Sequence, residues 1–392
     1  MGTNRKTHGL DGKLVEPDWP PLQLDEVRAV LSEFPDAHEP FRILSFSPRP
    51  FSAASVVDTA GGRVFIKRHH RDVRDAKGLM EEHRFMAHLQ SRGASVPNIL
   101  KTSTGATAIE ANQWTYEVHD APPGVDQYED AISWTPFRST AHARSAGQTL
   151  AHLHNAAAEY SAPARPPRPL VSSFTIFSAT NPADSMKRYL AARPSLTTHA
   201  AIYTDCDQAL DLLAPFHAEL LPNLPALRPL WTHNDLHASN LFWSDQSDAA
   251  RVTAVIDFGL ADRTNSIYDL AQAIERNIVK WLVLPKDLAL GSEVPVHLDH
   301  LSALLDAYES VRHLSEQEAS ALAPMTALCH AEFALTEADY FLGVLNSPEK
   351  ARVASHDYLV GHARWFRTDS GGKVLDAIRQ WAATRELRTV RA

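Results

Sequence analysis

One stretch, residues 230–262, limits what this chain can be more than any other part of it. It contains a His-x-Asp-Leu-x-x-x-Asn pattern over His233–Asn240, then two short apolar runs with a polar turn between them, and then Asp-Phe-Gly over Asp257–Gly259. The two apolar runs predict a short hairpin that holds both patterns in one place. The combination indicates a metal-assisted phosphoryl-transfer site.

Three polar side chains in these patterns carry the expected chemistry. Phosphoryl transfer depends on positioning, on charge neutralisation by magnesium, and on one group that orients the attacking hydroxyl and takes its proton. Asp235 is the predicted orienting group and base. Mg²⁺ prefers hard oxygen ligands and usually takes only one or two carboxylates besides phosphate oxygens, so Asn240 and Asp257 are the predicted metal ligands.

The order and spacing of the two patterns resemble the catalytic loop and metal-binding turn of protein kinases. Two departures are informative. Asn234 stands where protein kinases carry the arginine that meets a phosphorylated activation loop, and the chain after Gly259 runs directly into Ile267–Ala271, which leaves no room for such a loop. With these departures the chain resembles the aminoglycoside phosphotransferase and choline kinase family of small-molecule kinases.

The resemblance implies an α+β, bilobal, protein-kinase-like fold, and a length of 392 residues suits two lobes. We expect an N-terminal extension over residues 1–22, a nucleotide-binding lobe with a five-stranded antiparallel sheet over 23–118, and a mostly helical lobe with the catalytic loop and substrate site over 119–392. Apolar periodicity predicts strands at 41–46, 52–59, 63–69, 99–109 and 113–118, and helices at 24–34, 76–92, 139–158, 205–220, 266–281, 298–311, 317–340 and 373–385.

Lys67 is the predicted phosphate-binding lysine of the small lobe. It follows Val-Phe-Ile at the end of a strand, as the lysine does in the Val-Ala-Ile-Lys pattern of kinases. A lysine in a buried strand needs an anionic partner, because an unpaired ammonium in the interior is costly. Glu81 and Glu82 of the next helix are candidates, and we prefer Glu82 because residues 82–97 match the family's helix, turn and Val-Pro pattern.

The loop over residues 47–54 is expected to cover the phosphates of the nucleotide, which is ATP or GTP. This loop has none of the glycines of a Gly-x-Gly-x-x-Gly loop. Ser52 and the neighbouring backbone N–H groups are candidate phosphate contacts, and an ordinary turn between strands is the alternative.

The resemblance also implies that Glu117, Val118 and His119 form the linker between the lobes, whose backbone hydrogen-bonds the adenine edge. Trp114 or Tyr116 is a candidate for lining the adenine pocket, although aromatic residues at alternating strand positions are more often simply core.

Two residues are expected to support the catalytic loop. Asp269 lies in Tyr-Asp-Leu-Ala and matches the family's Asp-Leu-Ala, and His233 opens the first pattern. The pair His152 and His154 invites a metal site, but residues at i and i+2 of a helix do not share a face, which favours structural roles.

The proline-rich segment over 161–170 predicts a surface connection within the large lobe. Ammonium groups need anionic partners to be discriminated, so late acidic residues are candidate substrate contacts. These candidates are Asp262, Glu275, Glu332, Glu337 and Asp339, each of which is individually more typical of an ordinary exposed carboxylate.

Composition restricts the setting. The net charge of -9, from 47 acidic and 38 basic residues, argues against a nucleic-acid partner and is compatible with a cationic substrate. The isolated Cys206 and Cys329 indicate neither a disulfide framework nor a zinc site, and a reducing cytoplasm fits them best. The N-terminus lacks the apolar core of a signal peptide, and no apolar run approaches the ~20 residues of a membrane span.

We therefore expect Mg²⁺-dependent transfer of the nucleotide γ-phosphoryl group to a hydroxyl of a small molecule, foremost an aminoglycoside, amino sugar or related amino alcohol. The alternatives are a metabolic kinase of choline, homoserine or a sugar, and a non-catalytic nucleotide-binding protein on the same fold. The motifs leave open the acceptor, the choice of ATP or GTP, the oligomeric state, and a role in resistance or metabolism.

Overall fold

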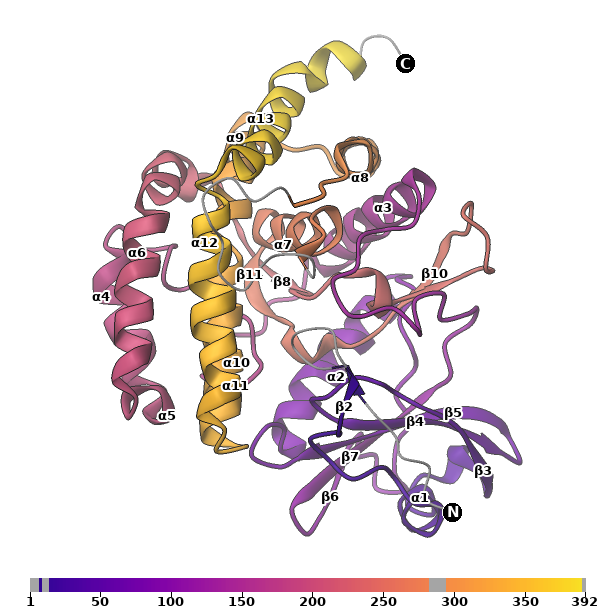
Figure 1. Cartoon of the computed structure of the whole chain (residues 1–392). Helices are drawn as coiled ribbons and strands as arrows, with labels where there is room; N and C mark the ends of the chain where they lie inside the picture. Colours follow the sequence, from indigo (N-terminus) through magenta and orange to yellow (C-terminus); the bar gives the residue numbers. More distant parts are fainter. Residues whose placement is uncertain (1–6, 9–13, 282–293, 390–392) are drawn as a thin grey trace.

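The computed structural model describes residues 7–8, 14–281 and 294–389, and it shows a small β-rich lobe beside a larger helical lobe (Figure 1). The N-terminus lies at the small lobe, whereas helix α13 (Asp369–Thr389) leads the C-terminus away on the far side of the large lobe. The predicted bilobal α+β architecture is confirmed.

The small lobe is built on a five-stranded antiparallel sheet, as predicted, with strand order β3-β4-β5-β7-β6. The prediction of one strand over 99–109 is wrong, because Gly105, with φ of 83°, turns the chain in its middle. Ile99 forms an isolated bridge to His119, and Ile109 begins the separate strand β6. The elements of this lobe are α1 (Leu24–Leu31), β3 (Pro40–Phe46), β4 (Ala53–Thr59), β5 (Gly62–His70), α2 (Ala76–Ser91), β6 (Ile109–Ala111) and β7 (Trp114–Asp120).

Alternation along β5 and β7 divides the sheet into two faces. Ile66 and Val118 lie opposite each other and belong to the apolar core that the sheet shares with α1. The adjacent pair, Lys67 and Glu117, points to the other face, where α2 and the large lobe lie. A single strand pair thus contributes both to the small core and to the cleft between the lobes.

The large lobe is helical, and its central helix, α7, is buried along its whole length. The predicted helix over 317–340 is in fact two helices, α9 and α10, separated at Cys329. The helices are α3 (Thr140–Ala157), α4 (Pro182–Ala191), α5 (Pro194–Thr197), α6 (Ala200–Leu220), α7 (Ser266–Ile278), α8 (Leu298–Val311), α9 (Glu316–Leu328), α10 (His330–Gly343), α11 (Pro348–Arg352), a π-helix over Val353–Val360, α12 (Gly361–Trp365) and α13.

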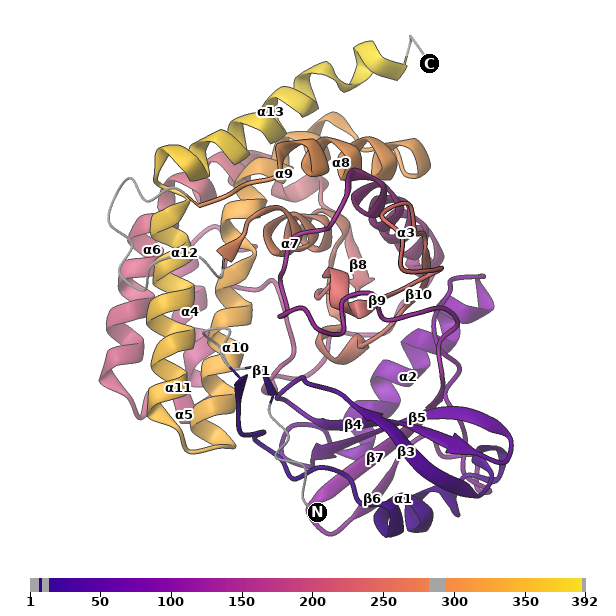
Figure 2. The same ribbon diagram turned by 45° about the vertical axis from the view of Figure 1, so that its right-hand side comes forward.

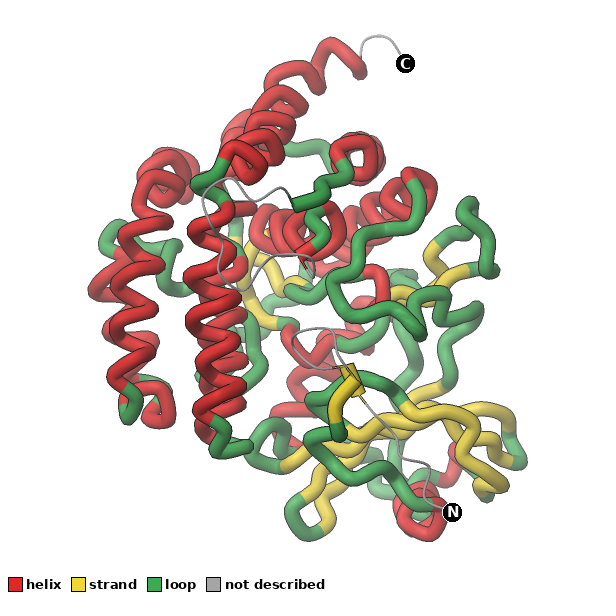
Figure 3. Tube along the Cα trace, in the orientation of Figure 1, coloured by secondary structure: helices red, strands yellow, loops and turns green. Residues whose placement is uncertain are grey.

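Two small antiparallel pairs lie between α7 and the small lobe and carry the sequence patterns (Figure 2). Strand β8 (Pro229–Thr232) pairs with β11 (Asp262–Asn265), and β9 (Leu241–Trp243) pairs with β10 (Val252–Val255). Figure 3 shows these strands as short yellow segments among the helices of the large lobe. The β9–β10 pair is the hairpin predicted between the two patterns.

The described part of the N-terminal extension packs against both lobes. The Trp19 ring stacks on His70 of β5, with ring centroids 5.0 Å apart, and the Pro20 carbonyl accepts a hydrogen bond from Arg68. Asp18 forms an ion pair with Lys350 of α11 in the large lobe. Within the described residues, no helix is both long enough and apolar enough to cross a membrane.

Candidate active site

The predicted catalytic loop, residues 233–240, follows β8. Asp269, in the first turn of α7, holds its backbone in place. The Asp269 carboxylate accepts hydrogen bonds from the backbone N–H groups of His233, at 2.9 Å, and Asn234, at 2.8 Å. It also pairs with His154 at 3.0 Å, which gives this buried histidine a structural role. Asn234 has a left-handed backbone, with φ of 61°, and this tight turn needs the support that Asp269 provides.

His233 links the two sequence patterns. Its Nδ1 accepts a hydrogen bond from the Asp235 backbone N–H at 3.1 Å, so Nε2 carries the proton and donates to the Ile256 carbonyl at 2.9 Å. Burial lowers the pKa of His233, which keeps the ring neutral and this hydrogen-bond arrangement intact. The residue therefore holds the loop against the strand that precedes Asp257.

Asp235 is held by two side chains. Asn240 donates its amide N–H to the Asp235 carboxylate at 3.2 Å and to the Asp235 carbonyl at 2.9 Å, and Arg276 of α7 forms an ion pair with the carboxylate. Burial raises the pKa of Asp235 to about 7 although Arg276 lowers it, and the negative charge of Asp257 adds to the rise. A pKa near neutrality suits a group that takes a proton from a hydroxyl.

Lys67 reaches across the cleft and forms an ion pair with Asp257, with 2.9 Å between Nζ and Oδ1. Burial opposes the charge of Asp257, but Lys67 outweighs it and lowers the pKa of Asp257 to about 2. Asp257 has φ of 60°, an uncommon backbone for a residue other than glycine that turns its carboxylate toward Lys67.

The residues fit the magnesium ion that this arrangement implies. Asp257 is ionised and its side chain is 36% exposed, so a hard oxygen ligand faces accessible space. The Asn240 amide nitrogen is engaged with Asp235, which leaves the amide oxygen as the ligand atom. Carboxylate and amide oxygens are donors of the kind that Mg²⁺ prefers.

The predicted ion pair between Lys67 and Glu82 is wrong. Glu82 instead accepts hydrogen bonds from Arg74 and Arg165, both at 2.7 Å. Both arginines also donate to the Gly259 carbonyl, so Glu82 anchors the turn that follows Asp257. Lys67 has Asp257 as its partner and does not need the helix glutamate.

The proline-rich segment over 161–170 is a surface connection without helix or strand, as predicted, but Arg165 points inward from it. The Arg165 side chain is buried, and its backbone N–H donates to Asp262 at 2.7 Å. Arg165 therefore links α2 to the Asp-Phe-Gly turn. Nothing in the local composition distinguishes a buried arginine of this kind from a solvated one.

The predicted linker position is also wrong. Glu117, Val118 and His119 lie inside β7, where they pair with β5, and the Val118 carbonyl accepts a hydrogen bond from the Leu100 N–H at 2.9 Å. The chain leaves the sheet only after Asp120. The segment after this residue is consequently the connection between the lobes.

The aromatic residues of β7 belong to the core of the small lobe, the alternative to a role in the adenine pocket. Tyr116 lies opposite Arg68, and its hydroxyl donates to Glu26 of α1 at 2.8 Å. Trp114 packs edge-on against Trp19 of the extension. Both side chains share the α1 face because they are an even number of residues apart, and the cleft face instead receives Glu117 and its neighbours.

Arg49 is a residue of the cleft that the sequence patterns did not identify. It lies in the loop between β3 and β4 and donates a hydrogen bond to the Ala131 carbonyl at 3.1 Å. Burial lowers the pKa of Arg49, and the negative charges of Asp126, Asp257 and Asp235 oppose this change. An arginine between two prolines was the available signal. Ser52, the predicted contact, is half-buried in the same loop and lines a small pocket with the extension.

Arg276 is a second unpredicted residue. Its guanidinium lies over the rings of Trp134 and Phe333, with 5.4 and 4.4 Å to the ring centroids. One nitrogen donates to the Asn234 carbonyl at 3.0 Å and to Asp235. Its Nε and Nη2 atoms are buried and have no hydrogen-bond partner among the described residues.

The structure separates the five acidic candidates for substrate binding. Four have protein partners: Asp262 binds the Arg165 N–H, Glu275 binds His362, Glu332 binds Ser173, Thr175 and Ile176, and Asp339 binds Ser195. Burial raises the pKa of the fifth, Glu337, to about 8, with Arg276 opposing the rise and Asp235 adding to it. Glu337 is therefore the candidate whose pKa responds to the charges of both Arg276 and Asp235, which belong to or contact the predicted catalytic loop.

An aspartate and an asparagine in the loop between β8 and β9, an Asp-Phe-Gly turn paired with a strand lysine, and the two-lobed fold together define a kinase-like phosphotransferase. The sequence profile of the phosphotransferase enzyme family matches residues 51–314, well over half of the chain. The chain belongs to this family, whose members include kinases that act on small molecules.

Similar known proteins have names that state different substrates. The chain is 26% identical over 311 residues to a homoserine kinase of Granulibacter bethesdensis, an alignment that covers 77% of this chain and 81% of that protein. Among solved structures, the chain is similar to amicoumacin kinase in complex with AMP-PNP, Ca²⁺ and Ami, with a TM-score of 0.56 and 13% identity over 87% and 93% of the two chains. It is similar to the microcompartment-associated aminopropanol kinase as well, with a TM-score of 0.57 and 17% identity over 89% and 99%. At these identities the solved structures show a shared fold.

Proposed function

We propose that this protein transfers the γ-phosphoryl group of ATP to a hydroxyl of a small amino alcohol, in a reaction that requires Mg²⁺. The observation that carries the proposal is the pairing of Lys67 with Asp257 across the cleft beside Asp235, a carboxyl whose pKa of about 7 suits a base. The site thus combines a positive charge from the small lobe, Lys67, with acidic groups from the large lobe. A shared fold alone would not select the reaction.

Each residue has a definite part in the proposed transfer. The acceptor oxygen attacks the γ-phosphorus, the bond to the ADP oxygen breaks, and Asp235 takes the hydroxyl proton. Asn240 and Asp257 would hold magnesium, which neutralises charge on the phosphate oxygens when bound. Lys67 from the sheet and Arg49 from the covering loop add positive charge to the same region.

Two acceptor classes are supported by different observations. Glu337 interacts electrostatically with Asp235, and its carboxyl, which a pKa of about 8 leaves mostly protonated at pH 7, would ionise on receiving the ammonium of an amino sugar or amino alcohol. The unpartnered N–H groups of Arg276 favour an acceptor that also carries a carboxylate, for which movement of the covering Trp134 and Phe333 rings is required. The homoserine kinase relative supports this second class, because homoserine is an amino alcohol with a carboxylate.

The test is phosphoryl transfer from ATP and Mg²⁺ to a panel of aminoglycosides, amino sugars, aminopropanol, homoserine, choline and neutral sugars. Asp235→Asn is the control, because it keeps the size of the side chain and removes the base. A hit that disappears in this variant supports the proposal and names the acceptor class. Turnover that survives in Asp235→Asn would contradict the role of Asp235, and nucleotide binding without transfer to any acceptor would favour a binding protein.

A further inference from the structure

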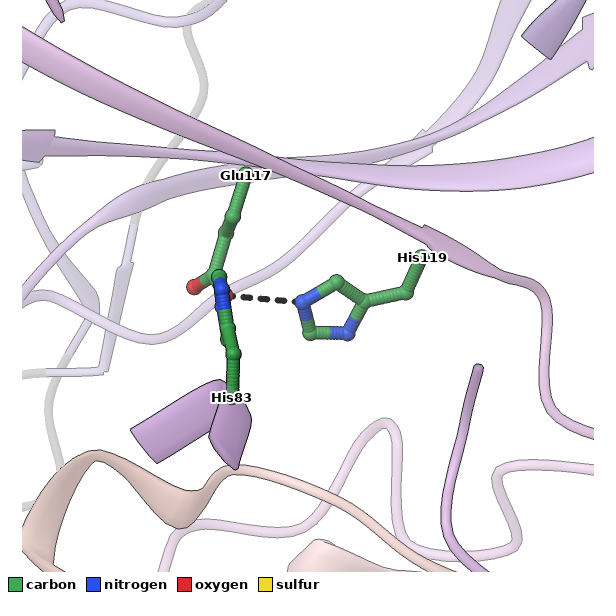
Figure 4. A group of neighbouring side chains, drawn as sticks. All are labelled: His83, Glu117 and His119. Carbon is green, nitrogen blue, oxygen red and sulfur yellow. Dashed lines mark hydrogen bonds and ion pairs between the residues drawn. The ribbon is translucent and has the colours of Figure 1, made fainter. Parts of the chain in front are cut away.

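Three histidines surround one carboxylate on the cleft face of the small lobe. The Nε2 atoms of His83 and His119 lie 2.7 and 2.8 Å from Oε2 of Glu117, and His69 Nε2 lies 2.8 Å from the other oxygen. Figure 4 shows that His83 and His119 converge on Glu117 from α2 and from β7. No step of the proposed phosphoryl transfer uses these four side chains.

The position of the cluster is unusual for an interior. His69 and Glu117 belong to the same sheet face as Lys67, and the helix above them presents His83. Glu117, His69 and His83 are each at most 5% exposed, and His119 is about one-eighth exposed by its side chain. Apolar residues would fill such a position at lower cost, since buried polar groups lose their hydration.

The hydrogen bonds of the cluster also define what a bound ion would replace. The Nε2 atoms of His83 and His119 both lie against Oε2 of Glu117, so a metal ion there would take the place of the shared protons. Metal binding by imidazole and carboxylate groups releases protons in this way.

We propose that His83, Glu117 and His119 bind a divalent transition metal ion of the zinc type, at a site separate from the magnesium ligands of the active site. The ligand atoms of the three residues lie within 4.8 Å of one another. Zinc bonds of ~2.0–2.2 Å in a tetrahedral site hold ligand atoms about 3.4 Å apart, so each histidine nitrogen must move away from Oε2 of Glu117 by about 0.6–0.7 Å. Two imidazoles and one carboxylate form a donor set that suits zinc, whereas Mg²⁺ requires mostly oxygen ligands.

His69 is not a ligand in the proposed site but orients the ligand Glu117. Its hydrogen bond to Oε1 of Glu117 fixes the carboxylate and leaves Oε2 directed at the two ligand histidines. Hydrogen bonds of this kind commonly orient the first ligands of a metal. With three protein ligands, the fourth position would be open, and the partial exposure of His119 places it toward solvent in the cleft.

The test is a titration of metal-free full-length protein with Zn²⁺, followed by calorimetry, and with Co²⁺, followed by visible absorption. His83→Gln and His119→Gln are the test variants, because glutamine still donates an N–H to Glu117 but is a poor zinc ligand. We expect one tight site in the wild type, at least tenfold weaker binding in each variant, and a rise in melting temperature with Zn²⁺ that both variants lose.

A second group, His297, Asp299 and His300 at the start of α8, provides the matched control because its ligand atoms also lie close together. His300→Ala should leave the tight site unchanged. Loss of binding in His300→Ala with retention in His119→Gln would overturn the proposal. Wild-type protein that binds neither metal would also overturn the proposal, and would identify His69, His83, Glu117 and His119 as a hydrogen-bonded network alone.

Discussion

The Asp235 carboxyl lies between two opposing influences, burial and the Arg276 guanidinium, and this balance sets a pH dependence. Its pKa is raised to about 7, and only the deprotonated form can take the hydroxyl proton. We therefore expect kcat/KM to fall about tenfold per pH unit below about 7 and to level off above it. The pH profile of phosphoryl transfer measures this directly.

The comparison variant for this profile is Arg276→Gln. Arg276 lowers the pKa of Asp235, so its removal should shift the limb of the profile to higher pH. An unchanged limb in this variant, or a wild-type limb near the pKa of an ordinary aspartate, would show that another group controls the rate.

Arg49→Ala should raise the KM for ATP with a small effect on stability. A charged hydrogen bond contributes about 1.5–3 kcal/mol, so a loss of roughly 10- to 150-fold is expected if Arg49 contacts the phosphates. Arg42→Ala is the control, since Arg42 is an exposed arginine of the same sheet that pairs with Asp58 at 3.2 Å. Equal KM values in the two variants would remove Arg49 from the nucleotide site.

At this scale the sequence could predict the residues that form a local pattern. Asp235, Asn240 and Asp257 are identifiable because their spacing is fixed by one loop and one hairpin. Arg74 and Arg165 come together from positions far apart in the chain, and their shared partner Glu82 was therefore given the wrong role. Local spacing in the sequence cannot identify an ion-pair partner that the fold brings from a distant part of the chain.

Among the elements, helix α2 has an anchoring role that a substitution can measure. Glu82→Gln removes the carboxylate that pairs with the buried guanidinium groups of Arg74 and Arg165, and leaves Arg165 with only the more distant Glu81. We expect a loss of about 3–5 kcal/mol in the free energy of unfolding, measured by urea denaturation, together with weaker activity because both arginines hold Gly259.

Glu81→Gln on the same helix is the control for this loss. Glu81 approaches Arg165 only at 3.5 Å and its side chain is 16% exposed, so its loss should be clearly smaller. Similar losses of unfolding free energy in the two variants would mean that Glu82 contributes no more to stability than Glu81 does.

Strand β7 shows why element boundaries limit sequence analysis. The strand was placed about two residues short, and its end at Asp120 moves Glu117, Val118 and His119 from the predicted linker into the sheet. Because side chains alternate, the same register decides that Tyr116 faces α1 and Glu117 faces the cleft. Periodicity predicts that a strand exists but not which of its faces meets the second lobe.

For the whole molecule, the two lobes are joined by contacts outside the linker. The Phe51 ring packs edge-on against Tyr340 of α10 at 5.2 Å between centroids, and Asp18 pairs with Lys350. We expect Phe51→Ala combined with Asp18→Asn to speed amide hydrogen exchange in residues 47–54 and to speed nucleotide release. The matched control is Phe41→Ala, because Phe41 is a largely exposed aromatic of the same lobe. Unchanged exchange in the double variant would show that these two contacts do not hold residues 47–54 against the large lobe.

Helix α7 has a consequence for how a protein of this kind can change. All thirteen of its residues are buried. Asp269, Arg276 and Asn277 of this one helix all form hydrogen bonds with the backbone of the predicted catalytic loop. Substitutions there would disturb the folded core and the chemistry together, so selection must preserve both or neither. Trp134 lies outside α7 in a loop and is only half-buried, so a substitution there disturbs the core less. Under the proposed function, a change of acceptor would arise at positions of this kind while the phosphoryl-transfer step is inherited unchanged.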